Sequence, residues 1–101
     1  MLDSFFNLNS IINSEENKNT IIIFGIDSCS YCKNSIELLK KYNMPFKYIN
    51  IEKYYKNFFN EIKEISKNLK DSEKIQNYKS VPMIFFNSRF IGGYTDLSSL
   101  F

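Results

Sequence analysis

At 101 residues the chain has the length of one compact domain, and 44% hydrophobic residues supply enough apolar material for a buried core. Its 13 basic and 11 acidic side chains leave a net charge of +2, which excludes the concentrated basic surface of a nucleic-acid-binding protein. No secretory signal, transit peptide or run of about 18 apolar residues is recognisable. We therefore expect a single domain over residues 1–101, monomeric and cytoplasmic, that binds neither nucleic acid nor membrane.

Residues 1–19 read as an N-terminal helix and loop. Apolar side chains recur at helical spacing over 2–13, and the polar segment 14–19 follows them. The β-branched run at 20–26 then predicts a strand buried on both faces, which we expect at the centre of a sheet.

A helix is predicted directly after this strand. Ser28 is placed to cap this helix, which extends from about Cys29 to Tyr42. Its apolar residues, Cys32, Ile36 and Leu39, recur every three to four positions. Alternating polar and apolar residues at 46–51 predict the next strand. A strand, a helix and a second strand in this order make the two strands parallel neighbours.

The second half of the chain predicts a long helix and two short strands, at 52–70, 81–87 and 89–91. The polar segment 71–79 extends the helix loosely. Asn87 and Ser88 form the turn of the hairpin, and Thr95 or Asp96 caps a final helical turn.

The two cysteines, Cys29 and Cys32, are spaced Cys-x-x-Cys at the junction of a predicted strand and helix. Because the chain has no His, a zinc site within it lacks ligands, and the spacing favours redox chemistry. At a helix start, unpaired N–H groups and the helix dipole stabilise a Cys29 thiolate, and Lys33 adds a cation. Cys32 is placed to resolve a mixed disulfide on Cys29. The alternative is two inert buried thiols.

Four motifs occur in order along the chain: Phe24-Gly25, Cys29-Ser30-Tyr31-Cys32, Ser80-Val81-Pro82 and Ile91-Gly92-Gly93-Tyr94-Thr95-Asp96. Together they resemble the glutaredoxin family over residues 20–97, and the last motif distinguishes it from thioredoxins. The resemblance implies an α/β, thioredoxin-like fold with a four-stranded mixed sheet flanked by helices. It also implies a glutathione-dependent oxidoreductase that reduces glutathione mixed disulfides and protein disulfides, with Cys29 as nucleophile and Cys32 as resolving thiol.

The resemblance further implies a cis Pro82 that faces the cysteines, with the backbone of Val81 paired to glutathione. The alternative is that Pro82 only begins an edge strand. The segment Gly92 to Asp96 suits the γ-glutamyl end, through N–H groups for its carboxylate and an acid for its ammonium; alternatively it is a turn and a helix cap. The expected glutathione contacts are Tyr31, Lys79, Ser80, Val81, Pro82, Gly93, Tyr94, Thr95 and Asp96.

Two positions depart from the family pattern. Ile26 stands where members usually carry a Lys or Arg for the glycyl carboxylate of glutathione, and Lys79 is placed to supply that charge. Ser30 replaces the usual Pro, and some members with this variant hold a [2Fe-2S] cluster between two subunits and two glutathiones. An iron–sulfur carrier using Cys29 is therefore one alternative function, and a thioredoxin-like protein disulfide reductase is another.

Overall fold

The computed structural model describes residues 8–101. Of the helix predicted over 2–13, the part that can be compared is α1 (Leu8–Asn13), and residues 1–7 lie outside the described residues. The predicted loop after it contains a short 3-10 turn, η2 (Glu15–Asn17). Ser14 caps this turn, since its hydroxyl accepts a hydrogen bond from the backbone N–H of Glu16 at 3.0 Å.

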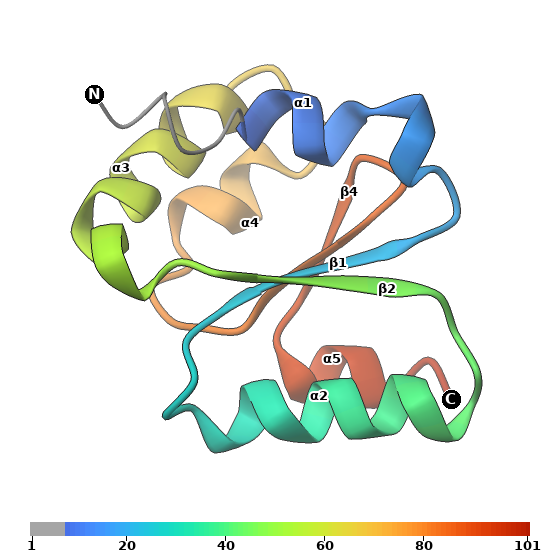
Figure 1. Ribbon diagram of the computed structural model, residues 1–101. Helices are drawn as coiled ribbons and strands as arrows, with labels where there is room; N and C mark the ends of the chain where they lie inside the picture. The colour runs from blue at the N-terminus through green and yellow to red at the C-terminus, as the bar shows by residue number, and fades with distance from the viewer. Residues whose placement is uncertain (1–7) are drawn as a thin grey trace.

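A four-stranded mixed sheet forms the middle layer of the molecule (Figure 1). Its strands are β1 (Ile21–Gly25), β2 (Phe46–Asn50), β3 (Met83–Phe86) and β4 (Arg89–Gly92). The order across the sheet is β2-β1-β3-β4. The β1–β2 pair is parallel, whereas β3 is antiparallel to both β1 and β4. The predicted fold class and the interior place of the first strand are confirmed.

Helices cover both faces of this sheet (Figure 1). They are α2 (Ser30–Lys41), the 3-10 turn η3 (Glu52–Tyr54), α3 (Tyr55–Ser66), α4 (Ser72–Gln76) and α5 (Tyr94–Ser98). α1, α3 and α4 lie on one face, and α2 and α5 on the other. Within residues 8–101, no helix has the length and apolar character needed to cross a bilayer.

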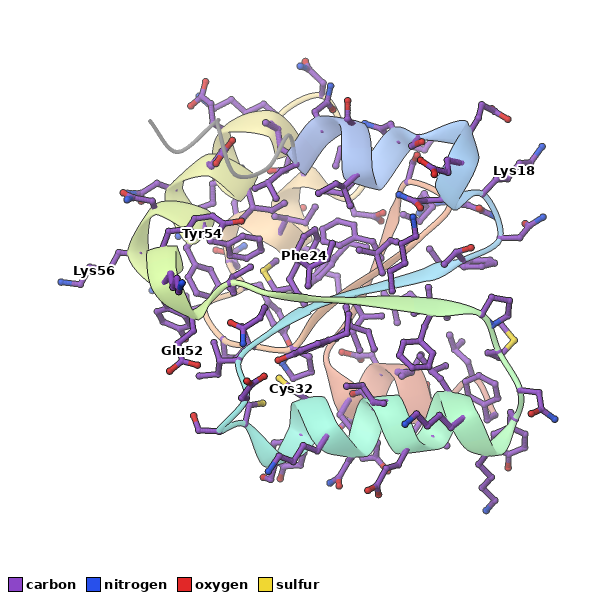
Figure 2. The ribbon with its side chains drawn as sticks, in the orientation of Figure 1. Lys18, Phe24, Cys32, Glu52, Tyr54 and Lys56 are labelled. Atoms are coloured by element: carbon purple, nitrogen blue, oxygen red, sulfur yellow. The ribbon has the colours of Figure 1, made fainter. Side chains whose placement is uncertain are left out.

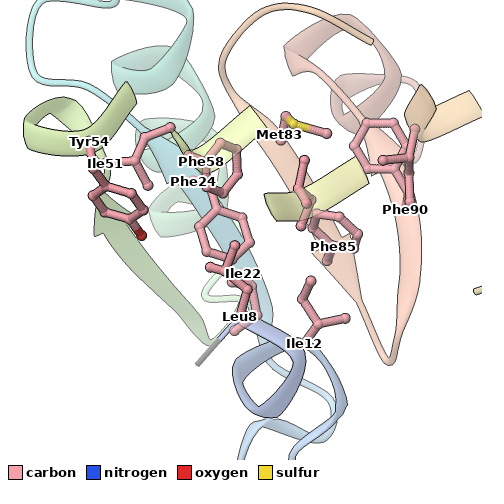
Figure 3. Packing of buried hydrophobic residues seen from close by; sticks show 12 residues of the cluster. Leu8, Ile12, Ile22, Phe24, Ile51, Tyr54, Phe58, Met83, Phe85 and Phe90 are labelled. Atoms are coloured by element: carbon pink, nitrogen blue, oxygen red, sulfur yellow. The ribbon is translucent and has the colours of Figure 1, made fainter. Parts of the chain in front are cut away.

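The core forms on both sides of β1 because every residue of this strand is buried. Ile22 and Phe24 point into the larger cluster, beneath α1, α3 and α4, where Phe24 contacts Phe58 with ring centroids 5.0 Å apart (Figure 3). Ile21 and Ile23 point into the smaller cluster, with residues of α2 and α5. Successive side chains of β1 therefore point into different clusters on the two faces of the sheet. This is the strand buried on both faces that the unbroken apolar run predicted.

The prediction of one helix over 52–70 with a loose extension was wrong. α3 ends at Ser66, and α4 is a separate helix that begins after Asp71. The physical reason is that residues of β4 bind the carboxylate of Asp71, the N-cap residue of α4, and so fix the chain where the new helix begins. The carboxylate accepts two hydrogen bonds from the Arg89 guanidinium, at 2.8 and 3.0 Å, and one from the backbone N–H of Phe90 at 2.9 Å.

The predicted hairpin turn between β3 and β4 is confirmed. Asn87 and Ser88 have φ angles of 49° and 67°, as a two-residue turn with left-handed residues requires. The Asn87 side chain also exchanges hydrogen bonds with Asn19, at 2.7 and 3.0 Å. The turn is therefore fastened to the loop that leads into β1.

Candidate active site

Cys29 is the N-cap residue of α2, at the end of the connection from β1. Its Sγ accepts a hydrogen bond from the backbone N–H of Cys32 at 3.0 Å. The prediction that Ser28 caps the helix was wrong, because the helix begins at Ser30 and the cap position falls on the cysteine. An N–H donor aimed at the sulfur from a helix start stabilises negative charge there.

Cys32 differs from Cys29 in its burial, since it is only 1% exposed whereas Cys29 is partly exposed. Figure 2 shows it near the start of α2, below the end of β1. Burial, with a smaller contribution from the hydrogen bond to Cys29, raises the pKa of Cys32 to about 12. Cys32 is therefore a neutral thiol near pH 7, and Cys29 is the sulfur that a substrate can reach.

The close approach of Cys32 to the sheet requires a glycine at position 25. A Cβ on Gly25 would lie 2.7 Å from the Cys32 Sγ and 3.1 Å from the Tyr48 ring. The sulfur and the ring of Tyr48 thus flank the same point at the end of β1.

Tyr48 and Asp27 form a hydrogen-bonded pair beside the cysteines that the sequence did not reveal. The Tyr48 O–H donates to the Asp27 Oδ1 at 3.1 Å and ties the loop before Cys29 to β2. Burial, and then the bond to Asp27, raise the pKa of Tyr48 above its usual value, so the phenol stays a neutral donor. No spacing rule links a strand residue to a loop residue at this separation.

The peptide bond before Pro82 is cis, and this segment faces the cysteines. The Val81 carbonyl oxygen lies 3.8 Å from the Cys29 Sγ. The segment that the resemblance assigned to glutathione is therefore in contact with the sulfur that it assigned as nucleophile.

A cleft of about 260 Å³ opens beside this contact. Its lining residues are Tyr31, Tyr78, Ser80, Val81, Pro82, Gly93, Tyr94, Thr95 and Asp96. All the expected glutathione contacts except Lys79 are among them. The rings of Tyr31 and Tyr94 stack with centroids 6.0 Å apart and form an aromatic wall.

The far part of the cleft is the start of α5. Its N-cap is Gly93, so the prediction of Thr95 or Asp96 as cap was wrong. Asp96 instead sits one turn in, where its Oδ2 accepts a hydrogen bond from the Gly93 N–H at 3.2 Å. Gly92 has a φ of 125°, which side chains rarely adopt, and a Cβ there would collide with the Asp96 carboxylate.

Lys79 lies outside the cleft and lines a neighbouring hollow of about 420 Å³. The other lining residues come from α3: Tyr55, Lys56, Phe59, Asn60 and Lys63. We call this the lysine hollow, because three lysines and no acidic residue line it. Ile26 packs against the same core cluster as Phe59.

Tyr78 is the cleft residue that sequence reasoning missed. A Cβ on Gly93 would collide with its hydroxyl, and its ring packs edge-on against Phe90 with centroids 5.1 Å apart. The signal was an aromatic residue two positions before Ser80. It was overlooked because residues 71–79 were interpreted as a polar extension of a helix.

Sequence comparisons agree with this geometry. The family model Glutaredoxin matches residues 21–91. A probable glutaredoxin of Acanthamoeba polyphaga mimivirus is 32% identical over 81 residues, which cover 78% of this chain and 74% of that protein. A mitochondrial glutaredoxin-2 of Pongo abelii is 31% identical over 83 residues, and the match spans 81% of this chain and 46% of the relative.

Solved structures give the same result for the fold. A dithiolic glutaredoxin from Trypanosoma brucei brucei superposes with a TM-score of 0.68 and 26% identity, covering 94% of this chain and 86% of the other. A buckwheat glutaredoxin–glutathione complex has a TM-score of 0.60 and 18% identity, covering 91% and 73%. The latter similarity establishes the fold alone.

Proposed function

The chain belongs to the glutaredoxin family of thiol-disulfide oxidoreductases, and we propose that it uses glutathione to reduce glutathione mixed disulfides and protein disulfides. One observation carries the proposal. The accessible sulfur of Cys29 lies beside the Val81 backbone, at the cleft that continues to Asp96. A tripeptide disulfide in this cleft would present its sulfur to Cys29. The buckwheat glutaredoxin was solved with glutathione, and membership of the same family, shown by the match over residues 21–91, supports glutathione as the ligand proposed here.

The first reaction is removal of glutathione from a protein. The Cys29 thiolate attacks the glutathione sulfur, a new S–S bond forms, and the protein sulfur leaves and takes up a proton. A second glutathione thiolate then attacks the glutathione sulfur bound to Cys29. This step releases oxidised glutathione and restores the Cys29 thiolate, so Cys32 is not required.

The second reaction is reduction of a protein disulfide. Cys29 attacks one sulfur and forms a mixed disulfide with the protein, whose other sulfur leaves as a thiol. Cys32 loses its proton and attacks the Cys29 sulfur, which releases the protein and forms a Cys29–Cys32 disulfide. Two glutathiones reduce this bond and become oxidised glutathione. Because burial raises the pKa of Cys32 in the reduced protein, this attack requires that the thiol first lose its proton.

Glutathione binding divides among three regions. The Val81 backbone pairs with the cysteinyl part, and the start of α5 offers N–H groups to the γ-glutamyl carboxylate while Asp96 accepts from its ammonium. The glycyl carboxylate extends toward the lysine hollow, where Lys79 supplies the charge that Ile26 lacks. The proposed setting is the cytoplasm, because a reducing pool keeps both cysteines as thiols.

An iron–sulfur carrier is the second candidate, favoured by the partly exposed Cys29 and by the Cys-Ser-Tyr-Cys motif. Within residues 8–101 no three His, Cys, Asp or Glu side chains gather into a metal site, so Cys29 would be the chain's ligand and the others would come from outside it. The visible absorbance spectrum of protein purified without oxygen distinguishes this function. A cluster spectrum in dimeric protein would support it, and a colourless monomer would contradict it.

The test of the main proposal is a reduction assay with a small glutathione mixed disulfide and reduced glutathione. We expect saturable turnover that Cys29→Ser abolishes. Turnover with a thioredoxin-reducing system, but none with glutathione, would instead identify a thioredoxin-like protein disulfide reductase.

A further inference from the structure

Tyr78 occupies a place in the cleft that its packing alone does not explain. Gly93 has φ and ψ of −101° and −160°, an extended conformation without a positive φ. A side chain at Gly93 is excluded because the Tyr78 hydroxyl stands where its Cβ would be. The glycine therefore accommodates a phenol oxygen.

Two chain segments meet at this hydroxyl. One is the loop that carries Tyr78 and Ser80, which are hydrogen-bonded to each other, and the other is the start of α5, where Gly93 is the N-cap. Asp96 is near enough for its negative charge to act on the phenol. The hydroxyl thus lies among residues of the cleft wall at its α5 end.

The phenol is a neutral hydrogen-bond donor in this place. Burial, the largest influence, raises the pKa of Tyr78 above its ordinary value. A neutral O–H that faces the cleft can donate a hydrogen bond to a carboxylate. Asp96 is anionic, so it repels a carboxylate and attracts an ammonium. An α-amino acid head, with one group of each kind, fits this pair.

We propose that the Tyr78 hydroxyl is a specificity-determining group that donates a hydrogen bond to the α-carboxylate of the γ-glutamyl residue of glutathione. This inference rests on the proposed function. It assigns recognition of the amino acid head to a residue of the loop before β3, outside the four motifs. A phenylalanine would keep the contact with Phe90 and lose this recognition.

The experiment compares two disulfide substrates on Tyr78→Phe in a Cys32→Ser background. One substrate carries glutathione, and the other carries cysteinylglycine, which lacks the γ-glutamyl group. Single-turnover transfer of the thiol to Cys29 is followed, so no glutathione is needed as reductant. For the glutathione substrate we expect the half-saturating concentration to rise roughly tenfold, with the maximal rate within about twofold. For the cysteinylglycine substrate we expect no change.

Tyr42→Phe is the matched control, because it removes an exposed phenol that stacks on Phe101 at the other end of α2. Equal weakening of both substrates by Tyr78→Phe would mean a structural role and overturn the inference. So would an unchanged preference for glutathione. If the enzyme with Tyr78 intact does not distinguish the two substrates, the glutathione assignment itself fails and this inference fails with it.

Discussion

The two ends of the cleft are built in different ways. The cysteine end, residues 25–32, comes from one strand, one loop and one helix start that follow each other in the chain. The other end, residues 92–96, is the one that we propose binds the γ-glutamyl group, and we call it the γ-glutamyl end. It is completed by Tyr78 and Ser80 from a separate segment. At both ends a glycine yields space to a neighbour: Gly25 to the Cys32 sulfur and Gly93 to the Tyr78 hydroxyl. Reactivity is thus set locally, whereas recognition depends on tertiary packing.

The largest expected effect concerns the two sulfurs of the cysteine end. Cys29→Ser should lower both reductions by at least about 10³-fold, because the nucleophile is lost. Cys32→Ser should keep the removal of glutathione and lose the reduction of protein disulfides. Steady-state assays of both reactions on both variants check this. Turnover by Cys29→Ser with none by Cys32→Ser would reverse the assigned roles.

The two glycines give the next effect and a direct test of the comparison. Gly25→Ala and Gly93→Ala should each destabilise the fold by about 1–3 kcal/mol, because each methyl group meets a packed neighbour. Tyr78→Phe removes the oxygen that Gly93→Ala meets, and should recover part of the lost stability. Chemical denaturation of the single and double variants measures this.

Gly25→Ala combined with Tyr78→Phe is the control pair, since Gly25 meets Cys32 and Tyr48 instead. These two changes should simply add. If Tyr78→Phe restores stability to both Gly93→Ala and Gly25→Ala, or to neither of them, the proposed difference between the two ends of the cleft is wrong.

The lysine hollow offers a smaller effect on glutathione binding. Lys79→Ala should raise KM for glutathione roughly tenfold, with kcat little changed, because a charge-assisted contact of about 1.5 kcal/mol is lost. Ile26→Lys should lower KM and restore most of the Lys79→Ala loss. Kinetics of the double variant test this coupling. An unchanged KM in both single variants would place the glycyl carboxylate elsewhere.

The smallest expected effect is a dependence of the free energy of unfolding on pH, which arises from an ion pair near the γ-glutamyl end. Hydrogen bonds from Arg89 hold the pKa of Asp71 at about 2, and this pair secures β4, the strand that leads to Gly92. A lowered folded-state pKa means that this stability is present above about pH 4, near the ordinary Asp value, and is lost as pH falls toward 2. Asp71→Asn should cost about 1 kcal/mol at neutral pH.

Thermal unfolding between pH 2 and pH 7 measures the difference between Asp71→Asn and the unchanged chain. The difference should shrink as the solution becomes more acidic. A constant difference across this range would contradict the role of the Asp71 charge.

The parts of the fold that the sequence predicted are those with local causes. β1 was found because its β-branched residues are contiguous, and the Asn87-Ser88 turn because its residues tolerate positive φ. Asp71 was missed because its partner, Arg89, lies 18 positions away. Ser28 was predicted as the cap because serine is a common cap residue, and only the backbone path decides which of two adjacent residues takes that position.

The same locality limited the prediction of the site. The motif residues Val81 and Gly93 were found in the sequence, and the structure brings both to one cleft. Tyr78 carries no motif, and its relation to Gly93 exists only after β3 and β4 have paired. Tyr48 and Asp27 similarly meet through the β1–β2 pairing.

Because Cys29 is the N-cap of α2, a disulfide formed at its sulfur should change the hydrogen bonding of the first turn of that helix. A sulfur that is bound in a disulfide has no negative charge and is a weak acceptor, so the N–H of Cys32 loses much of its partner. The first turn of α2 should then fray while a substrate is attached. Loading should thus loosen the segment that carries the second thiol. Amide hydrogen exchange at Cys32 would therefore report, in real time, whether the enzyme is empty or loaded.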